Sequence, residues 1–222
     1  MNASQKCFWS GVRQAVSVTL ILLFLCGFAF PVVLTGISSV VFPWQAAGSL
    51  VEVDGAVVGA THVGQEFTKD CFMKGRPSAY HYNTYTEDAN GNRYYSDGTE
   101  FGGLASGSSN YAPSNPALAE RVEADMEAFL AANPGISREE VPADLMTASG
   151  SGLDPHISPE AAAIQIPALA KATGLREEEL TQIVAENTQG KLLGIFGEQT
   201  VNVLGVNVEI ARAMGILTED GK

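Results

Sequence analysis

The chain has 222 residues, with 25 acidic and 13 basic side chains and a formal net charge of −12. All 25 acids but only 11 of the basic residues lie after Ser49, so that part alone carries a formal charge of −14. Such an acidic surface repels phosphate backbones and anionic headgroups, which excludes nucleic acid as an expected partner.

The N-terminal part of the chain is dominated by apolar residues. Residues 14–51 contain no charged side chain, and residues 16–34 are almost wholly apolar. A helix needs about 20 such residues to cross a bilayer core, and a single segment cannot close a β-barrel. We therefore predict one transmembrane helix over residues 15–40. Pro31 lies inside it and is expected to kink it, because proline removes a backbone donor.

Three other interpretations of the apolar stretch fit the residues less well. A cleaved signal peptide has an apolar region of about 7–15 residues and a small-residue cleavage site, whereas Ala29 is followed by Phe30. A lipoprotein anchor at Cys26 would need a small residue before it, and Leu25 stands there. A buried soluble helix would show a polar face, and this stretch shows none. The sequence therefore favours a retained membrane anchor.

Basic residues flank only the N-terminal side of the predicted helix. Lys6 and Arg13 precede it, and the next basic residue is Lys69. Cytoplasmic flanks of membrane helices carry an excess of Lys and Arg. We therefore predict a single-pass protein of the cell membrane, with residues 1–14 in the cytoplasm and residues 41–222 outside it.

The cysteines and histidines predict neither disulfides nor a metal centre. Cys7, Cys26 and Cys71 fall inside, within and outside the membrane by this topology, so no two of them can meet. One outer cysteine and three scattered histidines do not form the closely spaced ligand set of a zinc site.

The outer part begins with a predicted hairpin, in which an Asp-Gly turn joins residues 50–53 and 56–59. Further on, Arg76 precedes Pro77, which favours extended geometry at the arginine, and such an arginine usually pairs with a carboxylate. Residues 80–110 are aromatic, polar and glycine-rich without a sustained period. They predict an irregular loop with one short hairpin at an Asn-Gly-Asn sequence.

Helical signals dominate the C-terminal half. Asn115 is a good cap and Pro116 a favoured first residue for a helix that keeps one apolar face to about Ala132. Further helices are predicted over residues 159–173 (perturbed by Pro167), 177–187 and 205–214. Because strands and helices mix without a regular βαβ repeat, the predicted fold is an α+β extracytoplasmic domain anchored by one N-terminal transmembrane α-helix.

The densest group of candidate functional residues is a loop that contains Ser149, Gly150, Ser151, Gly152 and Asp154. A glycine- and serine-rich loop that leads into a helix N-terminus can hold an anion. The lysine of a phosphate-binding loop is absent from it. The residues alone therefore favour an ordered loop at a partner surface.

The same region contains the residue types of a hydrolytic triad, namely His156, Asp154 and Ser149 or Ser151. Asp154 and His156 are only two residues apart, however, and no Gly-x-Ser-x-Gly elbow is present. A membrane-anchored extracellular hydrolase stays an alternative, as does an anchored carbohydrate-binding module that uses the tyrosines of residues 80–110.

Eight motifs together resemble one known family. They are FPWQAAGSL at 42–50, VGQEF at 63–67, FMKGRPSA at 72–79, SNP at 114–116, VPADL at 141–145, TASGSGLDPHISP at 147–159, AAAIQIP at 161–167 and VNVL at 201–204. In this order they resemble the C subunit of the Kdp-type high-affinity potassium-transporting P-type ATPase. The resemblance covers nearly the whole chain, and the run at 147–159 is its most specific part.

The resemblance implies a non-catalytic accessory subunit of an ATP-driven potassium uptake complex. Its partners would be the bilayer, a channel-like subunit, a P-type pump subunit and a small single-helix subunit. It would aid assembly and act as a catalytic chaperone that raises the affinity of the pump subunit for ATP. The loop at 82–102 looks like an insertion relative to the usual family pattern.

The resemblance also implies where nucleotide or a partner would be contacted. No cofactor is expected to bind stably, and ATP would be reached through the complex with the pump subunit. The implied contact residues are Gln165, Ser149, Gly150, Ser151, Gly152 and Asp154. ATP is cytoplasmic, however, whereas the predicted orientation places these residues outside. We therefore expect the outer domain to dock over the external mouth of the channel-like subunit, with the kinked helix packed beside that subunit.

Overall fold

The computed structural model describes residues 3–217, so the ends of the predicted cytoplasmic and outer segments, residues 1–2 and 218–222, lie outside the described range. The chain divides into two units, Met1–Leu50 and Val51–Lys222. Each unit has its own architecture, and the division falls at the start of the first hairpin.

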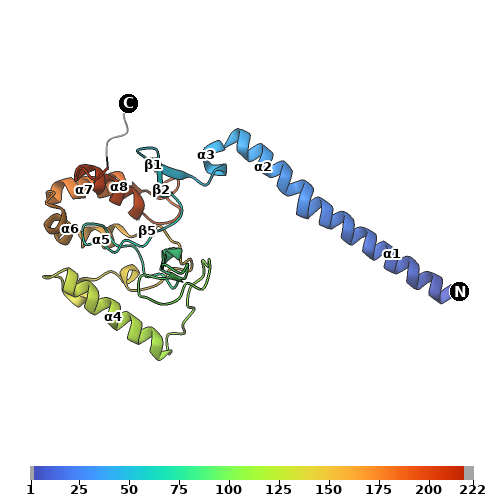
Figure 1. Cartoon of the computed structure of the whole chain (residues 1–222), viewed down its shortest axis with the longest axis horizontal. Helices are drawn as coiled ribbons and strands as arrows, with labels where there is room; N and C mark the ends of the chain where they lie inside the picture. Colours follow the sequence, from blue (N-terminus) through green and yellow to red (C-terminus); the bar gives the residue numbers. More distant parts are fainter. Residues whose placement is uncertain (1–2, 218–222) are drawn as a thin grey trace. The chain divides into compact units, whose positions relative to one another are not determined.

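The first unit is one long helix followed by a short one. Three segments form the long helix without interruption: α1 (Ala3–Phe24), the π-helical turn η1 (Leu25–Ala29) and α2 (Phe30–Val41). A single turn, α3 (Pro43–Ala46), follows (Figure 1). The helix begins well before residue 15, because nothing between Ala3 and the apolar stretch breaks a helical backbone.

The apolar helix has the properties of a membrane span. Its 34 residues from Phe8 to Val41 are long and apolar enough to cross a bilayer, and none of the most apolar window is buried inside the protein. At 1.5 Å per residue this is about 50 Å of helix, longer than the roughly 30 Å hydrocarbon core. The prediction of a single N-terminal apolar helix is thus confirmed.

The π-helical turn lies directly before Pro31. The backbone N–H of Phe30 donates to the carbonyl of Leu25, one residue further back than in an α-helix. In a regular helix the ring of Pro31 would press on the carbonyl of Gly27, four residues earlier. The local widening of the helix around Gly27 accommodates this ring, so the predicted disturbance at Pro31 takes the form of a π-bulge.

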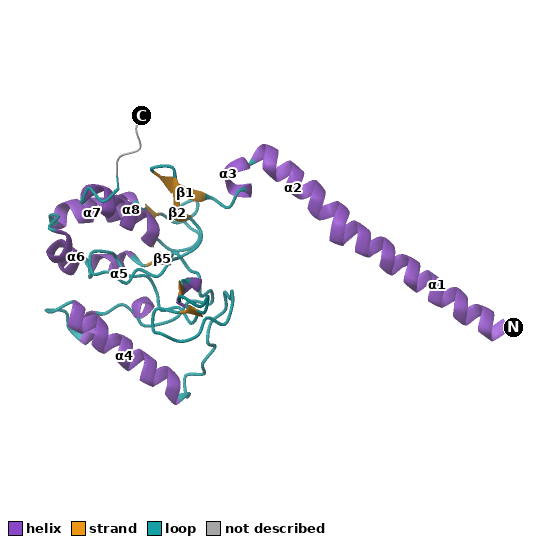
Figure 2. Ribbon diagram, viewed as in Figure 1, coloured by secondary structure: helices purple, strands orange, loops and turns teal. Residues whose placement is uncertain are grey.

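The rest of the described chain alternates short strands, turns and helices. In order these are β1 (Leu50–Val53), β2 (Ala56–Ala60), η2 (His81–Asn83), β3 (Thr86–Glu87), β4 (Arg93–Tyr94), α4 (Pro116–Ala132), η3 (Arg138–Glu140), η4 (Ala143–Leu145), β5 (His156–Ile157), α5 (Pro159–Ala163), α6 (Ile166–Thr173), α7 (Glu177–Glu186), β6 (Thr188–Gln189), β7 (Thr200–Asn202) and α8 (Val203–Ala213). Both predicted hairpins and the α+β class are confirmed. Figure 2 shows that most of the chain between β2 and α4 is loop.

The only sheet of three strands among the described residues has the order β5-β7-β6 and is antiparallel. His156 pairs with Asn202, and Thr188 pairs with Val201, which is fully buried. Asn202 also begins α8, because its side chain accepts the N–H of Gly205. The last helix therefore starts at Val203, two residues before the predicted start.

Helices enclose this sheet. In Figure 1, α4 lies along one side of the domain and α7 and α8 lie along the other, with α5 and α6 between them. The main core is a continuous apolar cluster whose most buried large members are Met73, Leu180, Val201, Val206 and Ile210. A smaller cluster of Val53, Leu204 and Val208 packs the first hairpin against α8.

The helix predicted over residues 159–173 is in fact two helices. α5 ends at Ala163 and α6 begins at Ile166, so the break precedes Pro167, the second residue of α6. Proline at this position fits a helix start, whereas in one continuous helix its ring would clash with the carbonyl of residue 163. The break leaves the buried side chain of Gln165 free to face another segment of the chain.

Two buried side-chain amides hold the extended segment at residues 73–74. Asn207 of α8 accepts the N–H of Met73 at 2.8 Å and donates to its carbonyl at 3.0 Å. Gln165 accepts the N–H of Lys74 at 2.8 Å and donates to its carbonyl at 3.2 Å and to that of Ala161 at 3.0 Å. Each side-chain amide thus supplies the acceptor and the donor that a neighbouring strand would supply. We call this pair of contacts the amide clamp.

The thiols at residues 26 and 71 are both free. The side chain of Cys7 lies outside the described side chains. Within the described residues, therefore, the domain is held by its core and its hydrogen bonds.

Replacing Asn207 with alanine tests the amide clamp. We expect Asn207→Ala to lower the free energy of unfolding by about 2–4 kcal/mol, because the buried N–H and carbonyl of Met73 lose both partners. The matched control is Gln182→Ala at an exposed position of α7, where only a surface contact with Glu186 is lost and the change should stay within about 0.5 kcal/mol. Chemical unfolding of the full-length protein in detergent, followed by circular dichroism, measures both. Equal losses in the two variants would contradict the clamp.

Candidate functional site

The glycine–serine loop (residues 147–154) joins η4 to β5 and is shaped by its own hydroxyls. The Oγ of Ser149 accepts the N–H of Ser151 at 3.4 Å, and the Oγ of Ser151 accepts the N–H of Leu153 at 3.2 Å. Such hydroxyl-to-backbone turns replace the hydrogen bonds of regular structure. Gly150 and Ser151 are exposed, so the loop presents its tip to solvent.

Gly152 fixes the loop to the rest of the domain. Its N–H donates to the carbonyl of Ser106 at 2.8 Å, and its carbonyl accepts the Oγ–H of Ser78 at 2.7 Å. Gly152 is buried, and a Cβ there would lie 2.7 Å from the backbone oxygen of Gly107. Only glycine allows this close approach of two loops.

The loop is braced by a left-handed turn at η2. His81, Tyr82 and Asn83 have φ angles of 45°, 54° and 57°, a conformation that costs residues other than glycine roughly 1–2 kcal/mol each. Ser78 holds the turn, because its Oγ accepts the N–H groups of Tyr80 and Tyr82 at 3.2 Å each. The same hydroxyl thus connects the strained turn to Gly152.

Tyr82 is the centre of this brace. Its hydroxyl donates to the carbonyl of Arg76 at 2.7 Å, and its ring covers Gly64, where a Cβ would lie 2.4 Å from the ring. Gly64 in turn donates its N–H to the carbonyl of Leu153 at 2.8 Å. Burial, with a smaller contribution from Asp154, raises the pKa of Tyr82 to about 12. The phenol is therefore neutral and serves as a structural donor.

Arg76 confirms the expectation that it pairs with a carboxylate. Its Nη1 lies 3.5 Å from the Oδ2 of Asp154, and its Nε and Nη2 donate to the carbonyl of Thr147 at 3.3 and 3.2 Å. The guanidinium therefore closes the two ends of the glycine–serine loop. The Oδ1 of Asp154 also accepts the N–H of His156 at 3.0 Å.

The triad residues are not arranged for hydrolysis. The Nδ1 of His156 lies 3.8 Å from Asp154 Oδ1, and burial lowers the pKa of His156 against the opposing effect of Asp154. Across residues 3–217, no hydrogen bond joins Ser149 or Ser151 to His156, whereas a nucleophile needs such a contact with its base. These hydroxyls bond to the loop backbone instead.

The hydrogen-bond partners of the Gln165 side chain lie outside the glycine–serine loop. Its amide oxygen accepts one backbone N–H and its amide nitrogen donates to two carbonyls, all within the amide clamp and α5. Gln165 is 4% exposed. A nucleotide or partner contact by Gln165 and the loop residues stays a prediction.

The side chain of Lys74 joins the extended segment at residues 73–74 to the chain just before it. Its Nζ donates to the carbonyls of Phe67 and Lys69 at 2.8 and 2.7 Å. Burial lowers the pKa of Lys74, with the charge of Asp70 acting in the opposite direction. The ammonium thus closes the loop before the amide clamp.

The sequence-based selection missed Gly64, Ser78 and Tyr82. Two of them, Gly64 and Ser78, lie inside the motifs at 63–67 and 72–79 on which the family resemblance rests. Their role depends on contacts across long stretches of chain, such as the 74 residues between Ser78 and Gly152. The sequence signal for Gly64 and Ser78 was their place in these motifs, but a motif does not indicate which distant residue each of them contacts.

Tyr85 and Tyr95 of the 82–102 loop pack on Phe101, and Tyr95 also packs on His81. Tyr85 stacks on Phe101 with ring centroids 4.6 Å apart, and Arg93 lies 4.7 Å above the Tyr85 ring. Tyr95 contacts both Phe101 and His81 at 5.2 Å. This arrangement is an aromatic cluster that supports the loop, with Tyr85 at its exposed edge.

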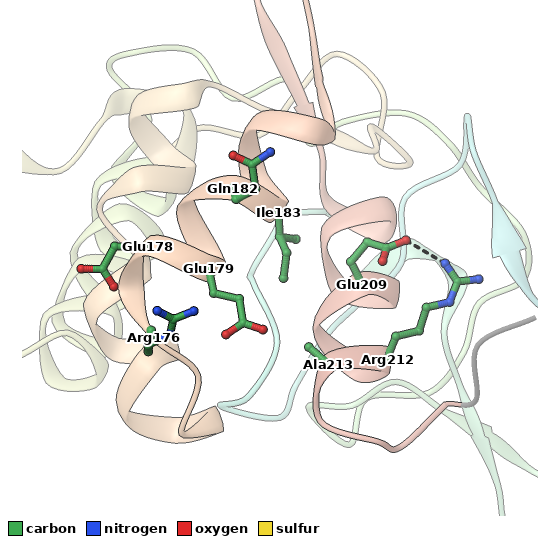
Figure 3. Close-up of a pocket in the computed structure, with 8 residues that line it drawn as sticks. All are labelled: Arg176, Glu178, Glu179, Gln182, Ile183, Glu209, Arg212 and Ala213. Carbon is green, nitrogen blue, oxygen red and sulfur yellow. Dashed lines mark hydrogen bonds and ion pairs between the residues drawn. The ribbon is translucent and has the colours of Figure 1, made fainter.

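A groove of about 610 Å³ lies elsewhere, between α7 and α8. Figure 3 shows that charged side chains of both signs line it, with Arg212 paired to Glu209. Two arginines and three glutamates among the lining residues leave it slightly acidic, so it does not favour a phosphate group. It contains none of the predicted site residues.

An alanine pair within the glycine–serine loop tests its packing. We expect Gly152→Ala to lower the free energy of unfolding by about 2–3 kcal/mol, because the new methyl group overlaps the carbonyl of Gly107. Gly150→Ala is the matched control, since no atom lies within 4 Å of its Cβ position. It should be neutral or stabilising by up to about 1 kcal/mol. Thermal unfolding of the full-length protein in detergent measures both, and equal effects would show that the loop is not closely packed.

The pKa of Tyr82 predicts an alkaline weakening of the fold. The folded-state pKa of about 12 exceeds the ordinary value of 10.0, so the stabilisation is complete below pH 10 and is lost as the pH rises through 12. Tyr82→Phe should abolish the tyrosinate absorbance that appears near pH 12. It should also cost about 1 kcal/mol at neutral pH, where the carbonyl of Arg76 loses its donor. Identical ultraviolet titrations of the two proteins would refute this assignment.

Comparison with known proteins gives the family. Residues 12–212 match the family described as "KdpC: K+-transporting ATPase, c chain". A "Potassium-transporting ATPase KdpC subunit" of Clostridium kluyveri is 55% identical over 96% of this chain and 98% of its own length. Proteins with the same description are 50% identical in Clostridioides difficile, over 93% of this chain and 99% of the relative, and 45% identical in Bradyrhizobium diazoefficiens, over 91% and 96%. The chain therefore belongs to the KdpC family.

Proposed function

We propose that this protein is the accessory C subunit of a potassium-transporting ATPase complex in the cell membrane. The observation that carries the proposal is the match of residues 12–212 to the KdpC family, which includes most of the apolar helix and almost the whole domain. The chain acts as a non-catalytic member of a hetero-oligomer. Its partners are a channel-like subunit, a P-type pump subunit and a small single-helix subunit.

The finer role is to aid assembly and to raise the affinity of the pump subunit for ATP. The domain after Val51 is braced at two places: Ser78 joins the strained η2 turn to the glycine–serine loop, and the amide clamp joins residues 73–74 to α8 and to Gln165. A rigid body suits a part that fixes the positions of others, because little conformational freedom is lost when it binds.

We place this domain on the extracytoplasmic side, with the N-terminus in the cytoplasm. Lys6 and Arg13, which precede the uncharged stretch at residues 14–51, support this orientation. From outside, the domain affects ATP binding through the complex, by stabilising the conformation of the pump subunit that binds ATP better. The residues from Ser149 to Asp154 then contact a partner subunit and not the nucleotide.

The domain docks over the external mouth of the channel-like subunit in this proposal. Its formal charge is strongly negative, with 25 acids in the part after Ser49. A surface of this sign raises the local concentration of cations. Potassium ions near the mouth of the transport path would be enriched in this way.

Removal of the subunit tests the proposed role. We expect the purified complex with this chain to show a KM for ATP lower by about fivefold or more than the same subunits without it, as for a coupling between distant sites. Steady-state ATPase measurements across ATP concentrations provide the comparison, and an unchanged KM would rule out the affinity role. Labelling of Cys71 by an impermeant thiol reagent on intact cells checks the orientation, and protection until lysis would reverse it.

A further inference from the structure

The connection between β6 and β7 carries an exposed apolar tip. Leu192, Leu193, Ile195 and Phe196 are 69%, 81%, 75% and 61% exposed. Four large apolar side chains within five residues are therefore exposed, and grouped exposed apolar side chains mark interaction sites more often than single ones do. We call residues 191–198 the apolar hairpin.

The apolar hairpin is rooted in the central sheet. It connects β6 to β7, which pair antiparallel through Thr188–Val201 and Gln189–Thr200. Its own backbone is closed by hydrogen bonds from Leu192 to Phe196 at 2.8 Å and back at 3.0 Å. The tip is therefore a fixed extension of the sheet with a defined shape.

The turn of the hairpin holds a leucine in a conformation that leucine disfavours. Leu193 has a φ of 55° and Gly194 a φ of 74°, as in the tight turns where asparagine and glycine are preferred. The Leu193 side chain is exposed to solvent, so its packing among the described residues does not offset the cost of this backbone conformation. Strain of this kind is found where the surrounding structure maintains it for a function.

Charge identifies the chemistry of the occupant. The one basic residue of the hairpin, Lys191, pairs with Glu198 at 2.8 Å, so the hairpin approaches a partner as a neutral, apolar knob. Loops that insert into membranes use unpaired lysine or arginine together with interfacial aromatic residues. The hairpin has an exposed aromatic residue, Phe196, but no unpaired basic side chain that would draw it to anionic lipid. It also belongs to a strongly acidic domain that anionic lipid repels.

We infer that the apolar hairpin docks into an uncharged, apolar pocket on another subunit of the ATPase complex. This inference rests on the proposed function, because membership of the complex supplies the partner. The preformed turn reduces the entropy lost on binding, and the apolar side chains form the dry centre of the contact, from which charged groups are depleted. The neighbouring ion pair of Lys191 and Glu198 lies at its rim.

Leu193→Asn separates docking from folding. Asparagine tolerates positive φ, so the melting temperature of the full-length protein in detergent should stay unchanged or rise by up to about 4 °C. Recovery of the other subunits with the tagged chain from co-expressing membranes should fall about tenfold or more. The control is Leu104→Asn, the same exchange at a leucine that is 83% exposed outside the hairpin, which should leave recovery unchanged.

Unchanged recovery with Leu193→Asn, or an equal loss with Leu104→Asn, would overturn the inference. A lower melting temperature that accompanies the lost recovery would show a structural role for Leu193 and would also count against docking. If the complex assembles normally with Leu193→Asn and the chain keeps its full effect on the KM for ATP, only the inferred role of the hairpin is rejected. An unchanged KM after deletion of the entire chain removes the proposed function instead.

A photo-crosslinking residue in place of Phe196 distinguishes protein from lipid as the occupant. Benzophenone-alanine at this exposed aromatic position, in the full chain expressed with its partners, should form a covalent adduct with another subunit of the complex. Mass spectrometry of the adduct identifies that subunit. Adducts with lipid alone, or with no molecule, would refute docking to a protein pocket.

Discussion

The amide clamp is the interaction on which the rest of the domain depends. A buried extended segment must satisfy every backbone N–H and carbonyl, yet no strand among the described residues lies beside residues 73–74. Asn207 and Gln165 each supply one acceptor and a donor group, as a neighbouring strand would. Successive residues of an extended chain direct their backbone groups to opposite sides. One amide therefore comes from α8 and the other from the break between α5 and α6.

The course of the chain after the clamp determines the candidate site. Once residues 73–74 are fixed, Arg76, Ser78 and Tyr82 fall against the glycine–serine loop and bond to it or to one another. The polar groups of that loop are consequently used mainly for internal contacts, and its tip is presented to solvent. A rigid joint of this type is suited to positioning a partner surface, whereas catalysis would need hydroxyls that face a base.

Anchor and domain divide the tasks of an accessory subunit. The apolar helix provides residence in the membrane, and the acidic domain provides a shaped surface with one neutral apolar extension, the apolar hairpin. This hairpin continues the strands β6 and β7, and β7 pairs with β5 and leads directly into α8. The sheet thereby connects the inferred docking element to the amide clamp.

Sequence alone determined the local features of this protein. The apolar helix, the two hairpins, the cap at Asn115 and the family follow from residues that are close in the chain, because turns, caps and hydropathy are local properties. Tertiary structure decided which distant residues meet. The contacts of Gly152 with Ser78, and of Gln165 with Lys74, join segments 74 and 91 residues apart. No periodicity or motif specifies such pairs, since they form only when the core brings the segments together.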